Sequence, residues 1–243
     1  MLIAGLNKTT LLDYPGRVAA TIFAGGCNFR CPFCHNGDLV LKPSSLEMIS
    51  EEEVLSFLQK RKNVLKGVCI TGGEPTLQAD LRDFIRKIKE IGYEVKLDTN
   101  GYLPEVLKTL LDDEVLDYVA MDIKSSKEKY GLAAGLENMD IGRIERSMEL
   151  LKNSGISYEY RTTVVKGLHA SEDILEIGKW IEKQPFAGYY LQTYKENEKS
   201  ILNLSSPRTE LFASFTKEEM QAMANMLNGL SGMNNRVFLR GVE

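Results

Sequence analysis

The sequence has little of what marks a secreted scaffold, a membrane protein or a nucleic-acid-binding surface. Its 243 residues contain four cysteines, too few for a disulfide framework of this length. No apolar stretch is long enough to cross a bilayer, and the N-terminus lacks the basic and apolar regions of a signal peptide. A formal net charge of −4 without a long run of like charges disfavours non-specific nucleic-acid binding. We therefore expect a cytoplasmic protein without a membrane or nucleic-acid partner.

Short apolar runs alternate along the chain with segments of helical periodicity. Runs typical of strands cover Val18–Ala24, Gly67–Thr71, Glu94–Thr99, Tyr118–Ile123, Tyr158–Val165 and Gly188–Thr193. Helical periodicity covers Glu51–Lys62, Asp80–Ile91, Pro104–Leu111, Ile141–Leu151, Ser171–Lys183 and Thr216–Leu230. This alternation predicts an α/β fold with a mostly parallel sheet. Because a closed barrel of this kind has eight units, six units predict an open, partial six-stranded parallel (β/α)6 barrel. No linker divides the chain, so residues 1–243 are expected to form a single domain.

Three of the four cysteines lie close together, with the spacing C-x3-C-x2-C formed by Cys27, Cys31 and Cys34. They follow a predicted strand, where the active sites of parallel α/β folds gather. A structural zinc site normally has four ligands, and His35 could supply the fourth. Cys69 lies in an apolar run typical of a small buried side chain. We favour a [4Fe–4S] cluster with three cysteine ligands and one iron open to a small molecule. A zinc site remains the alternative.

A second motif, Thr71-Gly72-Gly73-Glu74-Pro75, ends the next predicted strand. Two glycines would let the backbone approach a ligand without a Cβ atom. Glu74 would add a negative charge beside a cationic group of that ligand. Taken alone, the motif is also typical of an ordinary turn before a helix.

The later strands carry charged residues near their carboxyl ends. These are Asp98-Thr99-Asn100-Gly101, Asp122-Ile123-Lys124 and, within its strand, Arg161. Buried charges are rare in strands unless they are paired or bind a ligand. For Asp122 and Arg161, an internal ion pair that only stabilises the sheet is the alternative to a ligand-binding role.

The cysteine loop and the glycine motif together resemble the radical S-adenosylmethionine (SAM) superfamily. Its hallmark is C-x3-C-x-aromatic-C, in which Phe33 supplies the aromatic residue. The resemblance implies that Cys27, Cys31 and Cys34 hold a [4Fe–4S] cluster and that SAM chelates the fourth iron. Reduction would then cleave SAM to methionine and a 5′-deoxyadenosyl radical. We expect the residues around SAM to be Phe33, Gly72, Gly73, Glu74, Asp98, Asn100, Asp122, Lys124 and Arg161. No residue is assigned a separate catalytic role.

A narrower resemblance joins the segment Leu11–Gly16, the cysteine loop and His35-Asn36 to the glycyl-radical enzyme activating group. Within it, the chain is most similar to activating proteins of anaerobic ribonucleoside-triphosphate reductase. The pyruvate formate-lyase activator has a histidine after the sixth strand, whereas this chain has Gln192, a weak candidate. The other histidine, His169, lies in a different segment and receives no role.

This resemblance implies that a glycine Cα hydrogen is removed from a partner enzyme, the anaerobic reductase. It also implies an electron donor of the flavodoxin or ferredoxin type. Only about 40 residues without further cysteines separate Cys34 from Glu74, which implies a single cluster. The polar stretch Lys195–Arg208 is expected to form a surface loop that could contact a partner. The alternatives are activation of another glycyl-radical enzyme, small-molecule radical SAM chemistry, and a non-catalytic zinc-binding module.

Overall fold

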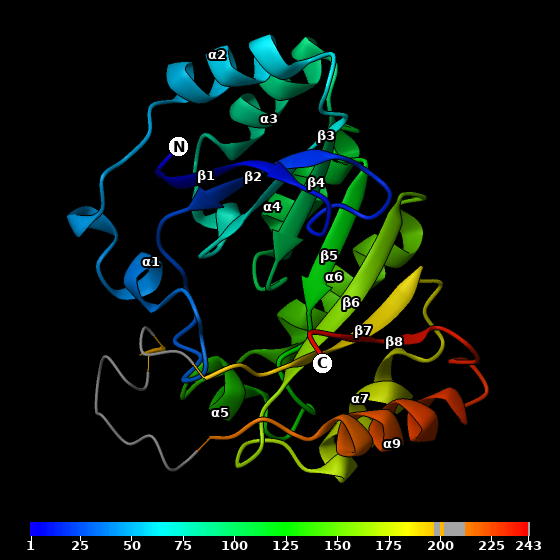
Figure 1. The fold of residues 1–243 in the computed structure, drawn as a ribbon. Coiled ribbons are helices and arrows are strands. Elements are labelled where there is room, and N and C mark those ends of the chain that lie inside the picture. Colours follow the sequence, from blue (N-terminus) through cyan, green and yellow to red (C-terminus); the bar gives the residue numbers. More distant parts are fainter. Residues whose placement is uncertain (197–199, 202–211, 243) are drawn as a thin grey trace. The chain divides into compact units, whose positions relative to one another are not determined.

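The computed structural model describes residues 1–196, 200–201 and 212–242 (Figure 1). Its strands form one sheet in the order β1 to β8, so strands that are neighbours in the sheet are also neighbours in the chain. The end strands β1 and β8 are not adjacent in this order, which leaves the sheet open. The strands are β1 (Ile3–Thr10), β2 (Ala19–Ala24), β3 (Gly67–Gly72), β4 (Glu94–Thr99), β5 (Tyr118–Asp122), β6 (Ser157–Val164), β7 (Gly188–Thr193) and β8 (Val237–Arg240).

The prediction of an open α/β sheet is confirmed, but the predicted number of six strands is wrong. All six predicted strands are present as β2 to β7. The structure adds β1, which pairs antiparallel with β2, and β8, which pairs parallel with β7. Strand β1 has three consecutive exposed polar residues, Asn7, Lys8 and Thr9, so the alternation of apolar and polar residues that marks a strand is not visible in its sequence. Strand β8 has only four residues, too few for a clear pattern.

The chain divides into two compact units that interleave along the sequence. The first comprises Met1–Asn28, Asp38–Ala120 and Arg143–Ser157. The second comprises Phe29–Gly37, Met121–Gly142 and Tyr158–Glu243. The boundary cuts the cysteine loop after Asn28. That the two units act as one domain stays a prediction.

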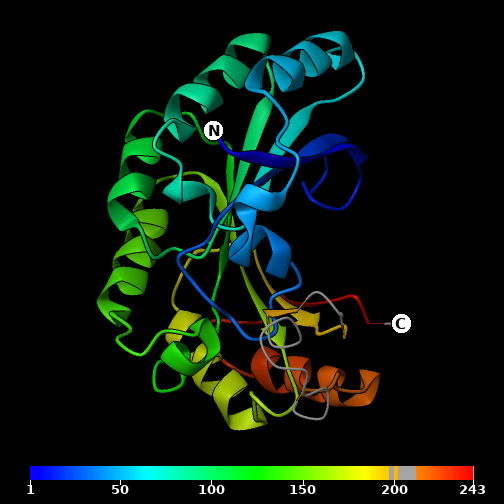
Figure 2. The same cartoon turned by 90° about the vertical axis from the view of Figure 1, so that its left-hand side faces the viewer.

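The first unit contains strands β1 to β4 and several helices, of which α3 (Leu81–Ile91) contacts β4. Helices α2 (Glu51–Arg61) and α3 lie side by side (Figures 1 and 2). The remaining helices are the short α1 (Gly37–Leu41), α4 (Pro104–Asp112) and α6 (Ile141–Asn153), most of which belongs here. Helix α3 buries Leu81, Phe84, Ile85 and Ile88, the stripe that its periodicity predicted. Short 3-10 turns cover Pro43–Ser45 and Pro75–Leu77.

In the second unit, helices α5 (Tyr130–Ala134), α7 (Ser171–Ile181) and α9 (Lys217–Asn228) accompany β7, β8 and most of β6. Helices α7 and α9 lie side by side, yellow-green and orange in Figure 1. Helix α9 begins with the side chains of Thr216 and Glu219 each accepting the other's backbone N–H. Most of the predicted loop Lys195–Arg208 lies outside the described residues. In the described parts of the chain, we find no helix of the length and apolarity needed to cross a membrane.

Candidate active site

The first part of the cysteine loop leaves the carboxyl end of β2 and is held by hydrogen bonds from two other segments. The N–H of Gly26 donates to the carbonyl of Leu39 at 2.8 Å. The side-chain amide of Gln78 donates to the carbonyl of Gly25 at 2.9 Å. Cys27, which follows directly, is therefore placed by a fixed backbone at the end of the strand.

The two glycines of the second motif allow the chain to approach itself. A Cβ atom on Gly73 would lie 1.9 Å from the carbonyl oxygen of Gly26. The N–H of Glu74 donates to that same oxygen at 2.8 Å. On Gly72, a Cβ atom would lie 2.5 Å from the backbone nitrogen of Ala24. The glycines thus bring this motif against the base of the cysteine loop, a reason that sequence analysis did not supply.

The carboxylate of Glu74 is buried and has partners inside the protein. Glu74 is 1% exposed. One oxygen accepts from the backbone and hydroxyl of Thr76 at 3.1 and 2.5 Å and from the hydroxyl of Thr99 at 2.8 Å. The other accepts from the backbone N–H of Asn100 at 2.7 Å. Glu74 therefore joins the ends of β3 and β4, and its predicted charge interaction with SAM stays a prediction.

Asn100 connects the end of β4 to the cysteine loop. Its side-chain oxygen accepts from the backbone N–H of Tyr102 at 2.9 Å. Its side-chain nitrogen donates to Asn28 Oδ1 at 2.7 Å and lies 3.9 Å from Cys27 Sγ. Asn100 is thus a structural link between two predicted binding motifs. Asn28, which sequence analysis did not consider, belongs to the same network.

Asp98 has a partner that sequence analysis missed. Lys96, 1% exposed, forms an ion pair with Asp98 on the same face of β4. Its ammonium also lies 3.8 Å from Cys69 Sγ on the neighbouring strand. The sequence does carry a signal for this ion pair, because residues two positions apart in a strand lie on the same face and here have opposite charges. Cys69 is fully buried, as its apolar run predicted.

In the second unit, the other two cysteines lie on a segment held against α5. The N–H of Arg30 donates to the carbonyl of Ala134, the last residue of α5, at 2.8 Å. Gly135 follows with a φ of +66°, and a Cβ atom there would lie 2.2 Å from the carbonyl oxygen of Arg30. Phe33 is buried, with its ring centroid 6.4 Å from that of His169.

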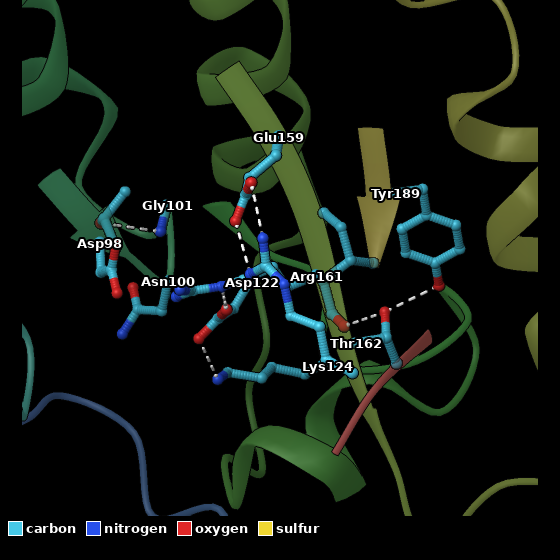
Figure 3. A network of polar contacts seen from close by, with 12 residues as sticks. Asp98, Asn100, Gly101, Asp122, Lys124, Glu159, Arg161, Thr162 and Tyr189 are labelled. Atoms are coloured by element: carbon cyan, nitrogen blue, oxygen red, sulfur yellow. Dashed lines mark hydrogen bonds and ion pairs between the residues drawn. The ribbon is translucent and has the colours of Figure 1, made fainter. Parts of the chain in front are cut away.

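Asp122 pairs with two cations at the end of β5 (Figure 3). Its carboxylate accepts from Lys124 Nζ and from Arg161 Nε, each at 2.9 Å. The structure thus contains the internal ion pair that was the alternative for Asp122 and Arg161. Burial acts to lower the pKa of Lys124, but the attraction of Asp122 and Cys31 outweighs it and raises that pKa.

His169 is a buried link that sequence analysis left without a role. Its Nδ1 atom accepts from the backbone N–H of Val165 at 3.0 Å. Nε2 therefore carries the proton and donates to the carbonyl of Lys124 at 2.8 Å. Burial lowers the pKa of His169, which keeps the ring neutral. His169 consequently holds the backbone at Lys124 and contacts Phe33 of the cysteine loop.

Two of the three thiols have amide donors close by. Cys27, Cys31 and Cys34 are all free of disulfides. Amide N–H groups approach two of them, that of Asn100 at Cys27 and the backbone N–H of Asn36 at Cys34. Such donors stabilise thiolates and tune cluster potentials. In the protein as described, no three His, Cys, Asp or Glu side chains gather closely enough for a metal ion. Cys27 belongs to one unit and the other two cysteines to the second, so their common ligation of a cluster stays a prediction.

Known proteins share both the sequence pattern and the fold. The Radical SAM superfamily matches residues 21–181. A Methanocaldococcus jannaschii protein provisionally named a glycyl-radical enzyme activating enzyme is 35% identical over 185 residues, which are 74% of this chain and 75% of that protein. A second protein of that organism with the same provisional name is 37% identical over 133 residues, or 53% and 45% of the two chains.

Further relatives and structures extend the comparison. A provisionally named GTP 3′,8-cyclase of Sulfolobus acidocaldarius is 37% identical over 105 residues, 41% of this chain and 31% of that enzyme. The crystal structure of a radical SAM methyltransferase from Sphaerobacter thermophilus matches with a TM-score of 0.72 at 14% identity, over 93% of this chain and 67% of that one. Streptococcus suis SuiB bound to S-adenosylmethionine matches with a TM-score of 0.64 at 16% identity, over 89% and 48%. The chain therefore belongs to the Radical SAM superfamily, and its cofactors are a [4Fe–4S] cluster and S-adenosylmethionine.

Proposed function

We propose that this radical SAM enzyme activates a glycyl-radical enzyme by removing a hydrogen atom from a glycine Cα. The observation that carries the proposal is the likeness to the first M. jannaschii protein, because it extends over about three quarters of both chains. The segment Leu11–Gly16 and the pair His35-Asn36 support it, since both resemble the activating group. Anaerobic ribonucleoside-triphosphate reductase is the proposed target, by the same resemblance.

In this proposal the cysteines bind the cluster, and most of the residues that bind SAM lie at or near the ends of strands. Cys27, Cys31 and Cys34 are the cluster ligands. The SAM-binding set is Phe33, Gly72, Gly73, Glu74, Asp98, Asn100, Asp122, Lys124 and Arg161. Hydrogen bonds and ion pairs already fix most of their polar side chains. A side chain that is already held within its own unit costs little binding energy to order when a ligand binds.

The chemistry comes from the cofactors, and the protein orients them. The cluster held by Cys27, Cys31 and Cys34, with SAM beside it, would supply a one-electron reductive cleavage of SAM, and the hydrogen atom taken from the glycine Cα would end up in 5′-deoxyadenosine. A low-potential donor of the flavodoxin or ferredoxin type would return the electron to the cluster. Lys124 and Arg161 carry the charge that a ligand carboxylate requires, while Asp122 holds both in place.

Electron paramagnetic resonance (EPR) under anaerobic conditions tests the cofactor roles. The reduced, reconstituted protein should show a [4Fe–4S]⁺ signal that changes shape when SAM is added. Alanine in place of Cys27, Cys31 or Cys34 should abolish the signal. A protein that instead binds zinc and gives no cluster signal would contradict the proposal.

The glycyl-radical step needs its own test with a purified partner. The activase, SAM, reductant and the anaerobic reductase should together yield a glycyl-radical EPR signal and about one 5′-deoxyadenosine per radical. Formate-lyase serves as the comparison substrate. A radical on formate-lyase alone would reassign the partner while leaving the activase class intact.

A small-molecule reaction is the second candidate, favoured by the likeness to GTP 3′,8-cyclases over 41% of this chain. The chain covers only 31% of that relative. SAM cleavage that is accelerated by GTP, with a cyclised nucleotide as product, would establish this alternative. No response to GTP, with a radical formed on a protein glycine, would reject it.

A further inference from the structure

Asn28 lies beside Cys27 in a network that fixes which end of its side-chain amide is which. The backbone N–H of Tyr102 donates to Asn100 Oδ1 at 2.9 Å, so the other end of the Asn100 amide is its NH2 group. This NH2 group donates to the Asn28 side chain at 2.7 Å. The atom of Asn28 that accepts must therefore be Oδ1. The other end of the Asn28 amide, Nδ2, is consequently an NH2 group that does not bond to Asn100.

This NH2 group has no partner in the described protein although it is buried. Of the described side chains, Asn28 Nδ2 is one of a few buried nitrogen or oxygen atoms without a hydrogen-bond partner. A buried donor left unsatisfied is costly, so in a native protein it calls for an explanation. The neighbouring oxygen of the same amide lies 3.8 Å from Cys27 Sγ. The unsatisfied donor thus belongs to the residue next to a proposed cluster ligand and in contact with it.

The Asn28 contact with Cys27 must change when this cysteine becomes a ligand. The neutral thiol can donate to Asn28 Oδ1, whereas a thiolate cannot donate and only accepts. Ligation therefore removes that hydrogen bond and places two acceptors near each other. Asn100, whose NH2 group reaches both atoms, keeps Asn28 Oδ1 satisfied. The remaining free donor at this position is Asn28 Nδ2.

We propose that Asn28 is a positioning residue for the iron–sulfur cluster, with its Nδ2–H donating to a sulfur atom at the Cys27 corner. The inference rests on the proposed ligation by Cys27. Hydrogen bonds to cluster and thiolate sulfurs stabilise the more negative, reduced form and so raise the reduction potential. Asn28 thereby makes the cluster easier to reduce, and Asn100 holds Asn28 in the orientation this requires.

The test is an EPR-monitored redox titration of the reconstituted protein without SAM. Asn28→Asp keeps the acceptor for Asn100 and removes the NH2 group, and Asn28→Leu removes hydrogen bonding without adding charge. Both variants should hold full iron and sulfide, and both should shift the cluster potential to more negative values. Asn7→Asp, which adds the same charge at an exposed residue of β1, should leave the potential unchanged. An unchanged potential in Asn28→Leu would overturn the inference, because the charge added in Asn28→Asp lowers the potential by itself.

A second measurement decides the matter if the variants fail to load a cluster. Pulsed EPR of the reduced protein labelled with ¹⁵N-asparagine should show a nitrogen coupling to the cluster spin that is lost in Asn28→Gln, which keeps an amide but carries no label at this position. The couplings of Asn36 and Asn100, which also approach cysteine thiols, should remain. A wild-type spectrum identical to that of Asn28→Gln would overturn the role of Asn28. A wild-type protein that binds no cluster at all would instead contradict the proposed ligation by Cys27. The two failures are therefore distinguishable.

Discussion

At the scale of single residues, the sequence indicated which polar side chains lie near the ends of strands but not what holds them. Glu74 and Asn100 were expected to face a ligand, and the structure shows each of them bonded within the protein. Lys96 and Asn28 were missed because neither belongs to a family motif. Partners of this kind depend on which strands become neighbours, information that spacing along one chain does not contain.

Glu74→Gln should destabilise the protein through the loss of charge-assisted hydrogen bonds. The buried carboxylate accepts four hydrogen bonds, and the amide would turn an NH2 group toward one of the donors. Burial raises the pKa of Glu74 and so offsets part of what its charge contributes. A buried donor left without an acceptor costs about 1–3 kcal/mol, and we expect a loss of that size in the free energy of unfolding. Urea denaturation measures it. Glu90→Gln, on the exposed side of α3, is the control and should change stability little; equal losses would contradict the prediction.

His169 should make stability fall as the pH is lowered. Burial depresses its pKa below the ordinary value of 6.5, while Asp173 acts in the opposite direction. Below about pH 6.5 the unfolded chain therefore binds a proton that the folded chain does not, and the folded state loses up to about 1.4 kcal/mol per pH unit until the folded pKa is reached. Above pH 6.5 this contribution to stability is fully present.

The measurement compares His35→Gln with His35→Gln/His169→Gln, because burial lowers the pKa of His35 as well. Urea denaturation of the cluster-free proteins at pH 7.5 and 5.5 gives, for each variant, the change in the free energy of unfolding with pH. The single variant, which retains His169, should lose roughly 1 kcal/mol more than the double variant over this range. Equal losses of unfolding free energy in the two variants would show that His169 does not titrate in the way its burial implies.

At the scale of elements, the six inner strands followed from their apolar runs, and the end strands did not. Inner strands are buried on both faces and read as continuous apolar segments. In β1 the consecutive residues Asn7, Lys8 and Thr9 are all exposed, which breaks the alternation of buried and exposed positions, and β8 is four residues long. The short α5 was also missed. Its role is visible only in its contact with the cysteine segment.

Gly135 at the end of α5 should be required for the position of that segment. Gly135→Ala places a methyl group against the Arg30 carbonyl and also forces a left-handed φ on alanine. Gly155 has a φ of +76°, and nothing lies within 4 Å of the place where a methyl group would be added, so Gly155→Ala carries the backbone strain alone. That strain costs about 1–2 kcal/mol, and crowding should add roughly 1–3 kcal/mol at Gly135. Thermal unfolding measures the difference.

The same pair of variants should differ in cluster loading. Gly135→Ala moves the backbone between Cys27 and Cys31, so less iron and sulfide should be retained after reconstitution. Gly155→Ala should load as the wild type does. Full loading of the Gly135 variant would show that contact with α5 is dispensable for the cysteine segment.

At the scale of the whole molecule, one cluster should account for all the bound iron. The fourth cysteine, Cys69, is fully buried and lies beside the Lys96 ammonium. Cys69→Ala should therefore bind as much iron and sulfide as the wild type, about four of each per chain for one [4Fe–4S] cluster. Iron and sulfide analysis after anaerobic reconstitution provides the numbers. A reduced content in this variant would make Cys69 a ligand and contradict the three-cysteine assignment.

The interleaving of the two units sets an order of events during synthesis. Arg30, between two of the cysteines, pairs with Ala134, which the ribosome adds about 100 residues later. At roughly 5–20 residues per second, that partner arrives about 5–20 s after the thiols have been made. During this interval Cys31 and Cys34 are nascent-chain thiols without the helix that later holds them. The segment that carries Cys31 and Cys34 therefore reaches its final contacts only after most of the second unit's sequence up to α5 has been synthesised.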